Sequence, residues 1–189
     1  MINEDLSLKL SELQGQIDIL KEKIVSLENS RRDQLSIALV SGDMDKILAT
    51  MIISLAAASM DTKVKLFFSF WDLAALRDKN KKAKGKDLIS KMFGAMLPTG
   101  KNKLKLSRMN MAGMGPLMIK SLMRKNGVLT LEEMFKEAGE LGIEITVCEM
   151  SMNLMGFKRE EMIDYPNLRY AGAGTFVADA GESSMQLFI

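Results

Sequence analysis

The chain has 189 residues, of which 47% are hydrophobic and 26% charged, enough for one ordinary domain with a buried core and an appendage. It contains no histidine and a single cysteine, Cys148. This composition excludes serine–histidine and cysteine–histidine catalysis, an internal disulfide, and metal sites built from several cysteines. We therefore expect neither a resident metal nor a cofactor. Because the N-terminus lacks the apolar run of a signal peptide and the longest apolar stretch, 47–60, is too short to span a bilayer, a cytoplasmic location is expected.

Residues 1–33 are expected to form an N-terminal coiled-coil helix. Isoleucine at two a positions and leucine at the d positions favour parallel two-stranded pairing. The alternative is a single amphipathic helix packed on its own domain. In either case the segment indicates an oligomerisation or docking device without chemistry of its own. Its apolar residues alternate at spacings of four and three, the heptad signature: Leu6, Leu10, Leu13, Ile17, Leu20, Ile24 and Leu27.

Residues 34–189 are predicted to form an open, three-layer α/β domain with a mostly parallel sheet. A strand, a turn, a helix and a second strand follow one another between Leu35 and Phe70, which is the βαβ arrangement. Asp43 is the expected N-cap of the first helix. The expected strands are 35–40, 62–70, 143–147, 168–171 and 185–189, and the expected helices are 44–60 and 131–141, with a short crossover at 174–183.

Charge is unevenly distributed, although the net charge is only +2. Between Arg77 and Lys125 there are 14 basic and two acidic residues, a local charge of +12, so the rest of the chain carries −10. Seven methionines lie between Met92 and Met123. We interpret residues 77–126, here called the basic insert, as methionine-rich helical pieces that favour an anionic ligand, an acidic partner or peripheral membrane contact. A solvated lysine-rich loop is the alternative, and nucleic-acid binding is not expected because the lysine run lacks interleaved aromatic residues.

Three segments follow expected strands at the carboxyl edge of the sheet, where open α/β domains bind their ligands. They are 41–43, 70–72 and 148–149. Cys148 precedes a helix expected to begin near Ser151, and free amides at a helix N-terminus favour a thiolate. Glu149 opposes that effect, so a cation from the basic insert is expected to compensate. A buried, inert thiol is the alternative interpretation.

Four motifs resemble those of the DsrE/DsrF-like family, and more closely its methionine-rich branch, labelled predicted peroxiredoxin-like. The motifs are CEMSMNLMGFKREE (148–161), SRMNMAGMGPLM (107–118), VSGDMDK (40–46) and FFSFWDL (67–73). The resemblance covers about residues 34–189 and implies a flavodoxin-like or Rossmann-like fold, usually assembled as a homo-oligomer. Better-understood members carry sulfur as a persulfide on one cysteine and exchange it with rhodanese-like and TusA-like partners. Cys148 matches the position of that cysteine, directly after a sheet strand.

The resemblance therefore implies a sulfur carrier or sulfurtransferase-like protein with Cys148 as the sulfur-bearing residue. Such a relay needs a nucleophilic thiolate but no metal and no histidine base. Two alternatives stay open: a non-catalytic module that docks on a protein or membrane, and a one-cysteine thiol peroxidase. The candidate substrate-pocket residues are Gly42, Asp43, Phe70, Trp71, Lys105, Arg108, Met109, Asn110, Met111, Glu149 and Ser151. We expect 77–125 to form a mobile flap over Cys148, its methionines excluding water while Lys105 and Arg108 attract anionic sulfur species.

Overall fold

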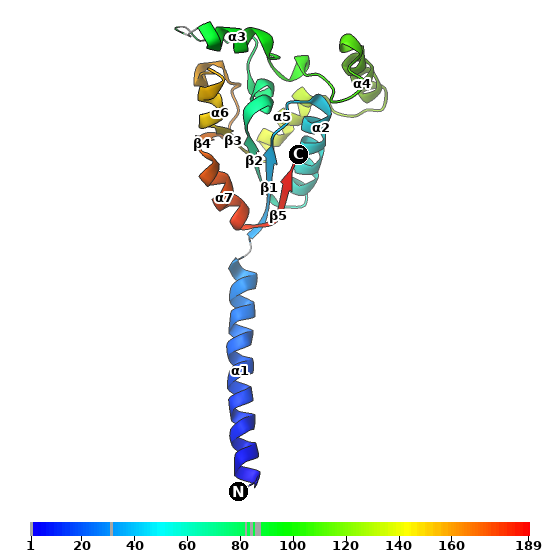
Figure 1. Ribbon diagram of the computed structural model, residues 1–189. Coiled ribbons are helices and arrows are strands. Elements are labelled where there is room, and N and C mark those ends of the chain that lie inside the picture. The colour runs from blue at the N-terminus through cyan, green and yellow to red at the C-terminus, as the bar shows by residue number, and fades with distance from the viewer. Residues whose placement is uncertain (1, 31, 82, 84, 86–87) are drawn as a thin grey trace. The chain divides into compact units, whose positions relative to one another are not determined.

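The computed structural model describes residues 2–30, 32–81, 83, 85 and 88–189, with side chains described except at 2–8, 28–30, 32 and 89 (Figure 1). The chain divides into two compact units, Met1–Arg32 and Asp33–Ile189. The first unit holds one helix, α1 (Ile2–Ser30), which confirms that the N-terminal segment is helical. None of the helices in the described part of the chain combines the length and apolarity that a bilayer-spanning segment requires.

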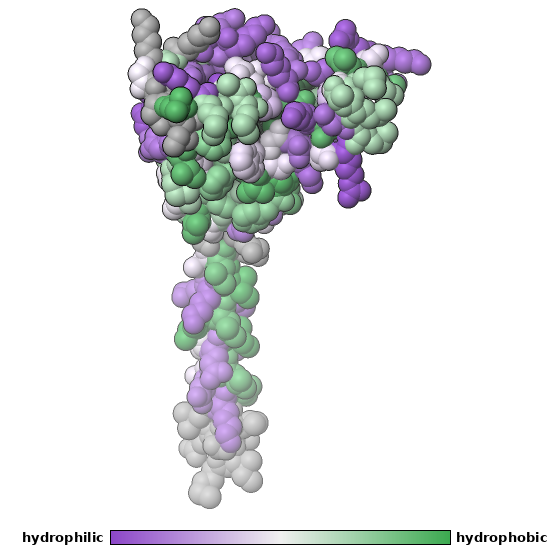
Figure 2. Space-filling view, turned by 45° about the horizontal axis from the view of Figure 1, so that its top comes forward, coloured by the Kyte–Doolittle hydropathy of each residue, from purple (hydrophilic) through white to green (hydrophobic). Residues whose placement is uncertain are grey.

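The apolar heptad residues of α1 are exposed. The described ones lie between 46% exposed, at Ile17, and 66% exposed, at Leu27. In Figure 2, green apolar side chains run along this helix beside purple charged ones. The side chain of Leu6 lies outside the described residues. Pairing of α1 with a second helix therefore stays a prediction, and the exposed seam is what such a pairing would bury.

The second unit contains a five-stranded sheet in the order β4-β3-β2-β1-β5, and all five strands are parallel. This confirms the predicted α/β class, with the sheet entirely rather than mostly parallel. The terminal strand pairs in parallel because the Val40 N–H donates to Ile189 O at 3.0 Å and the Ile189 N–H donates to Ala38 O at 3.0 Å. The strands are β1 (Arg32–Leu39), β2 (Lys63–Phe68), β3 (Glu144–Cys148), β4 (Leu168–Ala171) and β5 (Ser183–Phe188).

Helices cover both faces of the sheet, as Figure 1 shows. On one face, Phe68 of β2 and Phe135 of α5 are fully buried, with ring centroids 6.3 Å apart. Thr130 and Glu133 form a capping box at the start of α5, with the Thr130 N–H donating to the Glu133 carboxylate at 2.7 Å. The helices are α2 (Met44–Ala58) and α5 (Leu131–Glu140) on this face and α7 (Ala173–Gly181) on the other, while α6 (Glu149–Leu154) directly follows β3 at the carboxyl edge of the sheet.

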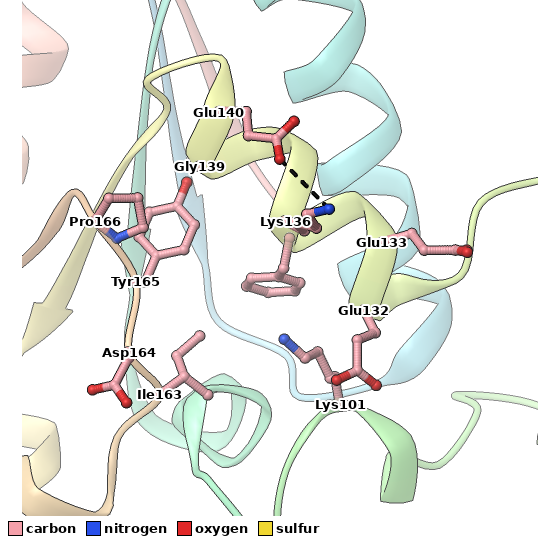
Figure 3. A pocket seen from close by; sticks show the side chains of 11 residues that line it. Lys101, Glu132, Glu133, Lys136, Gly139, Glu140, Ile163, Asp164, Tyr165 and Pro166 are labelled. Carbon is pink, nitrogen blue, oxygen red and sulfur yellow. Dashed lines mark ion pairs between the residues drawn. The ribbon is translucent and has the colours of Figure 1, made fainter.

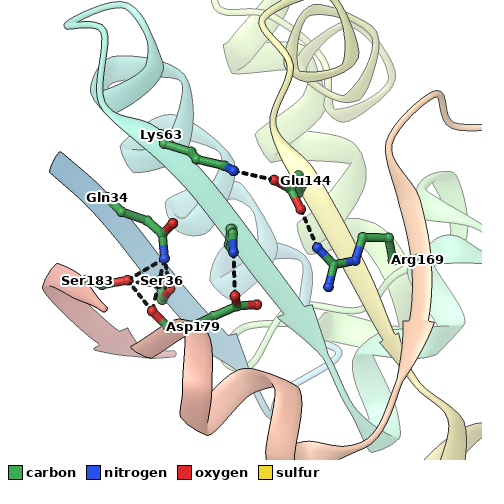
Figure 4. Close-up of polar contacts among 8 residues, drawn as sticks. Gln34, Ser36, Lys63, Glu144, Arg169, Asp179 and Ser183 are labelled. Atoms are coloured by element: carbon green, nitrogen blue, oxygen red, sulfur yellow. Dashed lines mark hydrogen bonds and ion pairs between the residues drawn. The ribbon is translucent and has the colours of Figure 1, made fainter. Parts of the chain in front are cut away.

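The helix α7 contacts the sheet through polar groups (Figure 4) and through Phe176, whose ring centroid lies 5.4 Å from that of Phe67 on β2 and 5.6 Å from that of Phe188 on β5. It has no buried residue, yet its Asp179 forms an ion pair with Lys65 of β2. The Ser183 hydroxyl accepts a hydrogen bond from the Gln34 side chain at 2.8 Å and lies 2.8 Å from the Ser36 hydroxyl. These groups lie toward the amino ends of the strands, away from the edge that carries Cys148.

The start of α2 differs from the sequence prediction. Asp43 occupies the N-cap position, but its carboxylate makes no capping hydrogen bond. It accepts instead from the Ser41 hydroxyl at 2.9 Å. The Met44 N–H donates to the carbonyl of Lys105 at 2.7 Å, so the backbone of the basic insert satisfies the first amide of α2.

The described part of the basic insert consists of short helical pieces beyond the carboxyl edge of the sheet (Figure 1). It is attached at several points: Arg77 donates to the carbonyls of Gly94 at 3.2 Å and Pro98 at 3.4 Å, and Leu104 is buried. Figure 2 shows purple basic and pale green apolar side chains together at this end of the domain. The pieces are α3 (Leu88–Met96), η2 (Lys101–Lys103), η3 (Met111–Gly113) and α4 (Met114–Lys125).

Candidate functional site

Cys148 is the last residue of β3 and the N-cap of α6. Val147 pairs with Phe68, the last residue of β2, so the segments that leave these two strands emerge side by side. The cysteine is only 1% exposed. The apolar strand sequence accounts for this burial, because parallel strands covered on both faces place every side chain in the interior.

A chain of buried hydroxyl groups ends at the sulfur atom. The Ser151 hydroxyl, one helical turn into α6, donates to the Cys148 Sγ at 3.2 Å. Ser69, which directly follows β2, lies with its hydroxyl 3.0 Å from that of Ser151. Ser151 is fully buried and Ser69 is 8% exposed. A hydrogen bond donated to sulfur orients it and compensates negative charge that it carries.

Asp72 lies beside this chain, in the 3-10 helix η1 (Phe70–Leu76) that follows β2. Its side chain is fully buried, and neither carboxyl oxygen has a hydrogen-bond partner among the described residues. Burial raises the pKa of Asp72 well above its ordinary value, and the nearby charge of Cys148 raises it further. The backbone amide of Ser69 lies close enough to lower the pKa of Asp72 and so opposes this rise. It does not form a hydrogen bond of normal geometry with either carboxyl oxygen.

The loop after β1 packs tightly against η1. A Cβ atom on Gly42 would lie 2.4 Å from the carbonyl oxygen of Trp71, so only glycine permits this approach. Phe70 has a positive φ of 57°, which turns the chain sharply after β2. The Trp71 side chain is 52% exposed and therefore lies at the surface, whereas Asp72 points inward. The three segments expected at this edge are thus brought together, with Cys148, Ser69 and Ser151 in the interior.

Glu149 is paired with a cation from outside the basic insert. It forms an ion pair with Arg159, whose guanidinium carbon lies 4.5 Å from the centroid of the Tyr170 ring. Arg159 lies outside the basic insert, so the cation that compensates Glu149 does not come from the insert. A cation from the insert beside Cys148 itself stays a prediction. The pair neutralises the carboxylate next to the cysteine in sequence.

The candidate pocket residues of the basic insert are displayed at the surface. Lys105 and Arg108 are exposed, Met109 is 75% exposed and Met111 is 52% exposed. Asn110 accepts a hydrogen bond from the Leu106 N–H at 3.4 Å. No hydrogen bond or ion pair among the described residues joins these side chains to Cys148. Their proposed role as a flap over the cysteine therefore stays a prediction.

A cavity among the described residues lies away from Cys148. It measures about 490 Å3, lies along α5 and does not reach Cys148 (Figure 3). The Lys101 ammonium nitrogen lies over the Phe135 ring, 4.8 Å from its centroid. Lys136 and Glu140 form an ion pair of 3.7 Å, marked by the dashed line in Figure 3. Burial lowers the pKa of Lys101. The lining contains no nucleophilic thiol or serine: Lys101, Glu132, Glu133, Phe135, Lys136, Gly139, Glu140, Ile163, Asp164, Tyr165 and Pro166.

Sequence reasoning selected Cys148 and Ser151 but not Ser69 or Asp72. Ser69 directly follows β2, and Asp72 lies in the segment 70–72 that the sequence placed at this edge without singling it out. Polar residues at that place in a parallel sheet are the available signal. Their burial could not be read from the sequence, because serine and aspartate are usually exposed.

Comparison with known proteins agrees with this architecture. Residues 31–188 match the model of the DsrE/DsrF/DrsH-like family. The chain is 44% identical over 154 residues to the uncharacterized protein YrkE of Bacillus subtilis, covering 82% of this chain and 95% of that protein. It is 31% identical over 160 residues to the sulfur carrier protein DsrE2 of Allochromatium vinosum, covering 82% and 98%. The crystal structure of the E. coli ychN protein shares the fold, with a TM-score of 0.50, 8% identity, and coverage of 84% of this chain and 99% of that one. The resemblance seen in the sequence motifs is thereby confirmed, and the chain belongs to the DsrE/DsrF/DrsH-like family.

Proposed function

We propose that this protein carries sulfane sulfur as a persulfide on Cys148. The observation that carries this proposal is the hydrogen bond from Ser151 to the Cys148 sulfur, inside a buried polar cluster at the carboxyl edge of the sheet. Family membership and the similarity to a sulfur carrier protein support a role in sulfur relay. The nature of the bound sulfur species and its attachment to Cys148 are the proposal.

The chemistry requires only the thiolate and a sulfur donor. The Cys148 thiolate attacks the sulfane sulfur of a donor such as thiosulfate, a new S–S bond forms at Sγ, and the donor's own bond to that sulfur breaks. The electron pair of the broken bond leaves on sulfite. In delivery, an acceptor thiolate attacks the outer sulfur, and the electron pair of the Sγ–S bond returns to Cys148. The donor and acceptor proteins proposed for this exchange are rhodanese-like and TusA-like, and the proposed compartment is the cytoplasm.

The burial of Cys148 suits a protein that protects the sulfur atom it carries. A persulfide on a side chain that is 1% exposed is shielded from solvent thiols that would remove its outer sulfur. Loading then requires the covering segments to move aside.

Incubation with polysulfide should add the mass of one sulfur atom to the full-length protein, and Cys148→Ser should abolish the addition. Because Cys148 is the only cysteine, intact-mass measurement reads this site directly. A matched control is Cys148→Ser combined with Met150→Cys, which places an exposed thiol two residues away, since Met150 is 60% exposed. Sulfur on Cys148 should persist at least about tenfold longer against glutathione than sulfur on this control thiol.

Three other results would count against this proposal. A folded protein whose thiol takes up no sulfur would favour a docking module. Rapid consumption of peroxide with an external thiol reductant would favour a peroxidase. Equal persistence of sulfur on Cys148 and on the control thiol would show that the cluster does not protect a persulfide.

We also propose that residues 1–33 form a coiled-coil arm that assembles copies of the 34–189 domain into a homo-oligomer. The exposed heptad seam of α1 supports this. Light scattering should give an oligomer for the full chain, and Ile17→Lys with Ile24→Lys should lower its mass because both residues occupy a positions of the seam. Ile19→Lys is the control, since Ile19 is 57% exposed but lies off the seam. A monomeric wild type, or an oligomer insensitive to the seam substitutions, contradicts the coiled-coil proposal.

A further inference from the structure

The helix α4 presents apolar side chains to solvent as well as to the domain. On its inner side Pro116 is buried, and Ile119 and Met123 pack against the core. Its outer side carries four apolar residues at spacings of three and four positions, so they share one face of the helix. A helix on a domain surface normally turns its apolar stripe inward, and an exposed apolar patch marks a binding surface. The outer residues are Met114, Leu117, Met118 and Leu122, between 50% and 67% exposed.

The turn before α4 displays two more methionines. Met109 is 75% exposed and Met111 is 52% exposed, and both have positive φ, 55° and 44°, which folds the backbone sharply. The turn packs against the helix, because a Cβ atom on Gly115 would lie 2.0 Å from the carbonyl oxygen of Met109. The N–H and the hydroxyl of Ser107 both donate to the Asp45 carboxylate, at 2.8 and 2.6 Å. These contacts fix the exposed methionines on a framework that is attached to α2.

The surroundings of these apolar side chains are basic. Residues 101–125 contain seven basic residues and no acidic one. Burial lowers the pKa of Lys120, and the positive charge of Arg124 lowers it further. In Figure 2, pale green side chains at this end of the domain have purple hydrophilic ones around them. Five of the basic residues are exposed and form no ion pair among the described residues: Lys103, Lys105, Arg108, Arg124 and Lys125.

We propose that this surface binds peripherally to a bilayer that contains anionic lipids. The headgroups of such a bilayer offer negative charge to the lysines and arginines, and the acyl boundary just below accepts the apolar side chains. Methionine suits a fluid partner because its flexible side chain adapts to irregular surroundings. The binding surface, called here the α4 face, consists of Met109, Met111, Met114, Leu117, Met118 and Leu122 with the five exposed cations.

Two other partners match the α4 face less well. A second copy docked face to face would bring two sets of unneutralised cations together, which opposes association. An acidic protein would satisfy the charge, but tight protein interfaces are centred on anchors among which tryptophan and tyrosine are prominent. Residues 101–125 contain no aromatic residue. A lipid surface needs no such anchor, because it takes up outward-pointing apolar side chains without a preformed pocket.

Cosedimentation of the full-length protein with lipid vesicles tests this proposal. Affinity for vesicles of phosphatidylcholine and phosphatidylglycerol, in about a 2:1 ratio, should exceed that for phosphatidylcholine alone at least about tenfold and should fall as salt rises. Arg124→Gln with Lys125→Gln should weaken binding about 25-fold, since each cation near the surface contributes a factor of about five. The control is Lys63→Gln with Lys136→Gln, which removes the same charge from outside the basic insert.

Glutamine substitutions test the apolar contribution separately, because glutamine keeps helix propensity and adds no charge. Leu117→Gln with Leu122→Gln should weaken vesicle binding at least about tenfold, because two leucine side chains no longer enter the acyl boundary. Met60→Gln with Val177→Gln is the control, since these residues are 76% and 68% exposed but lie outside the basic insert. Urea unfolding verifies that each variant is folded.

Several results would overturn the proposal. One is protein that does not bind vesicles with phosphatidylglycerol, or binds both vesicle types equally. Another is binding that neither α4 variant weakens, which would place the contact on a different exposed apolar surface such as α1. Absence of vesicle binding, with retention on immobilised polyglutamate that Arg124→Gln and Lys125→Gln abolish, would assign the α4 face to an acidic protein. Absence of vesicle binding, with an oligomer mass that Leu117→Gln and Leu122→Gln lower, would assign it to a second copy.

Discussion

Asp72→Asn should make the protein more resistant to unfolding at neutral pH, and the gain should grow as the pH rises. The pKa of Asp72 is raised in the folded protein, mainly by burial. Above about pH 4 the unfolded chain loses this proton while the folded protein keeps it. Each pH unit between the unfolded and the raised folded pKa therefore lowers the free energy of unfolding by about 1.4 kcal/mol, a loss that asparagine does not suffer.

Urea unfolding of both full-length proteins at several pH values, at one protein concentration, measures this difference. The decrease in the free energy of unfolding of the wild-type protein should be absent below the pKa that Asp72 has in the unfolded chain. It should accumulate as the pH rises toward the higher pKa of Asp72 in the folded protein. Carboxylates whose pKa is lowered, such as Asp45 and Glu144, act in the opposite direction but equally in both proteins. The slope should persist in a Cys148→Ser background, because burial is the larger cause of the shift. A difference that does not change with pH would mean that Asp72 is ionised in the folded protein.

A buried, unpartnered carboxyl is a local conflict, and such conflicts in natural proteins concentrate at functional sites. Its presence beside the only cysteine is consistent with a requirement of the site rather than of the fold.

Lys65→Ala should lower the free energy of unfolding by about 2 to 3 kcal/mol, whereas Lys63→Ala, two residues earlier in β2, should cost less than about 1 kcal/mol. The Lys65 and Asp179 side chains are only 12% and 15% exposed, so removing the ammonium group leaves a nearly buried carboxylate under α7 (Figure 4). Lys63 is 50% exposed, and its partner Glu144, 2.9 Å away, also binds Arg169 at 2.7 Å. The removal of Lys63 therefore leaves no unpaired charge.

Urea unfolding of the two single variants and of Lys65→Ala with Asp179→Ala checks this pair. The double variant should recover part of the loss, because it removes the carboxylate that the single variant leaves unpaired. Equal losses for Lys63→Ala and Lys65→Ala would show that burial of the ion pair does not matter to the stability of the α7 contact.

The order and type of the elements in the α/β domain could be predicted from sequence. Apolar runs such as Leu35–Leu39 and Ile143–Val147 are strands that need burial on both faces, and the helix between the first two strands forces a parallel connection. From strand ends alone, the sequence also placed Cys148, Gly42 and Trp71 at one edge. The heptad spacing of residues 6–27 likewise predicted the helix α1, because a periodic pattern is local.

The environment of Cys148 was decided only by the tertiary structure. Ser69 and Ser151 are 82 residues apart and meet because β2 and β3 pair in register, which no local pattern specifies. Likewise, the carbonyl of Lys105 caps α2, and Arg159, rather than the basic insert, pairs with Glu149. Local propensity and periodicity determine which segments form helices and strands. Hydrogen-bond partners, the burial of Asp72 and the pairing of Glu149 with Arg159 depend on which distant segments pack together. Those contacts exist only in the folded chain.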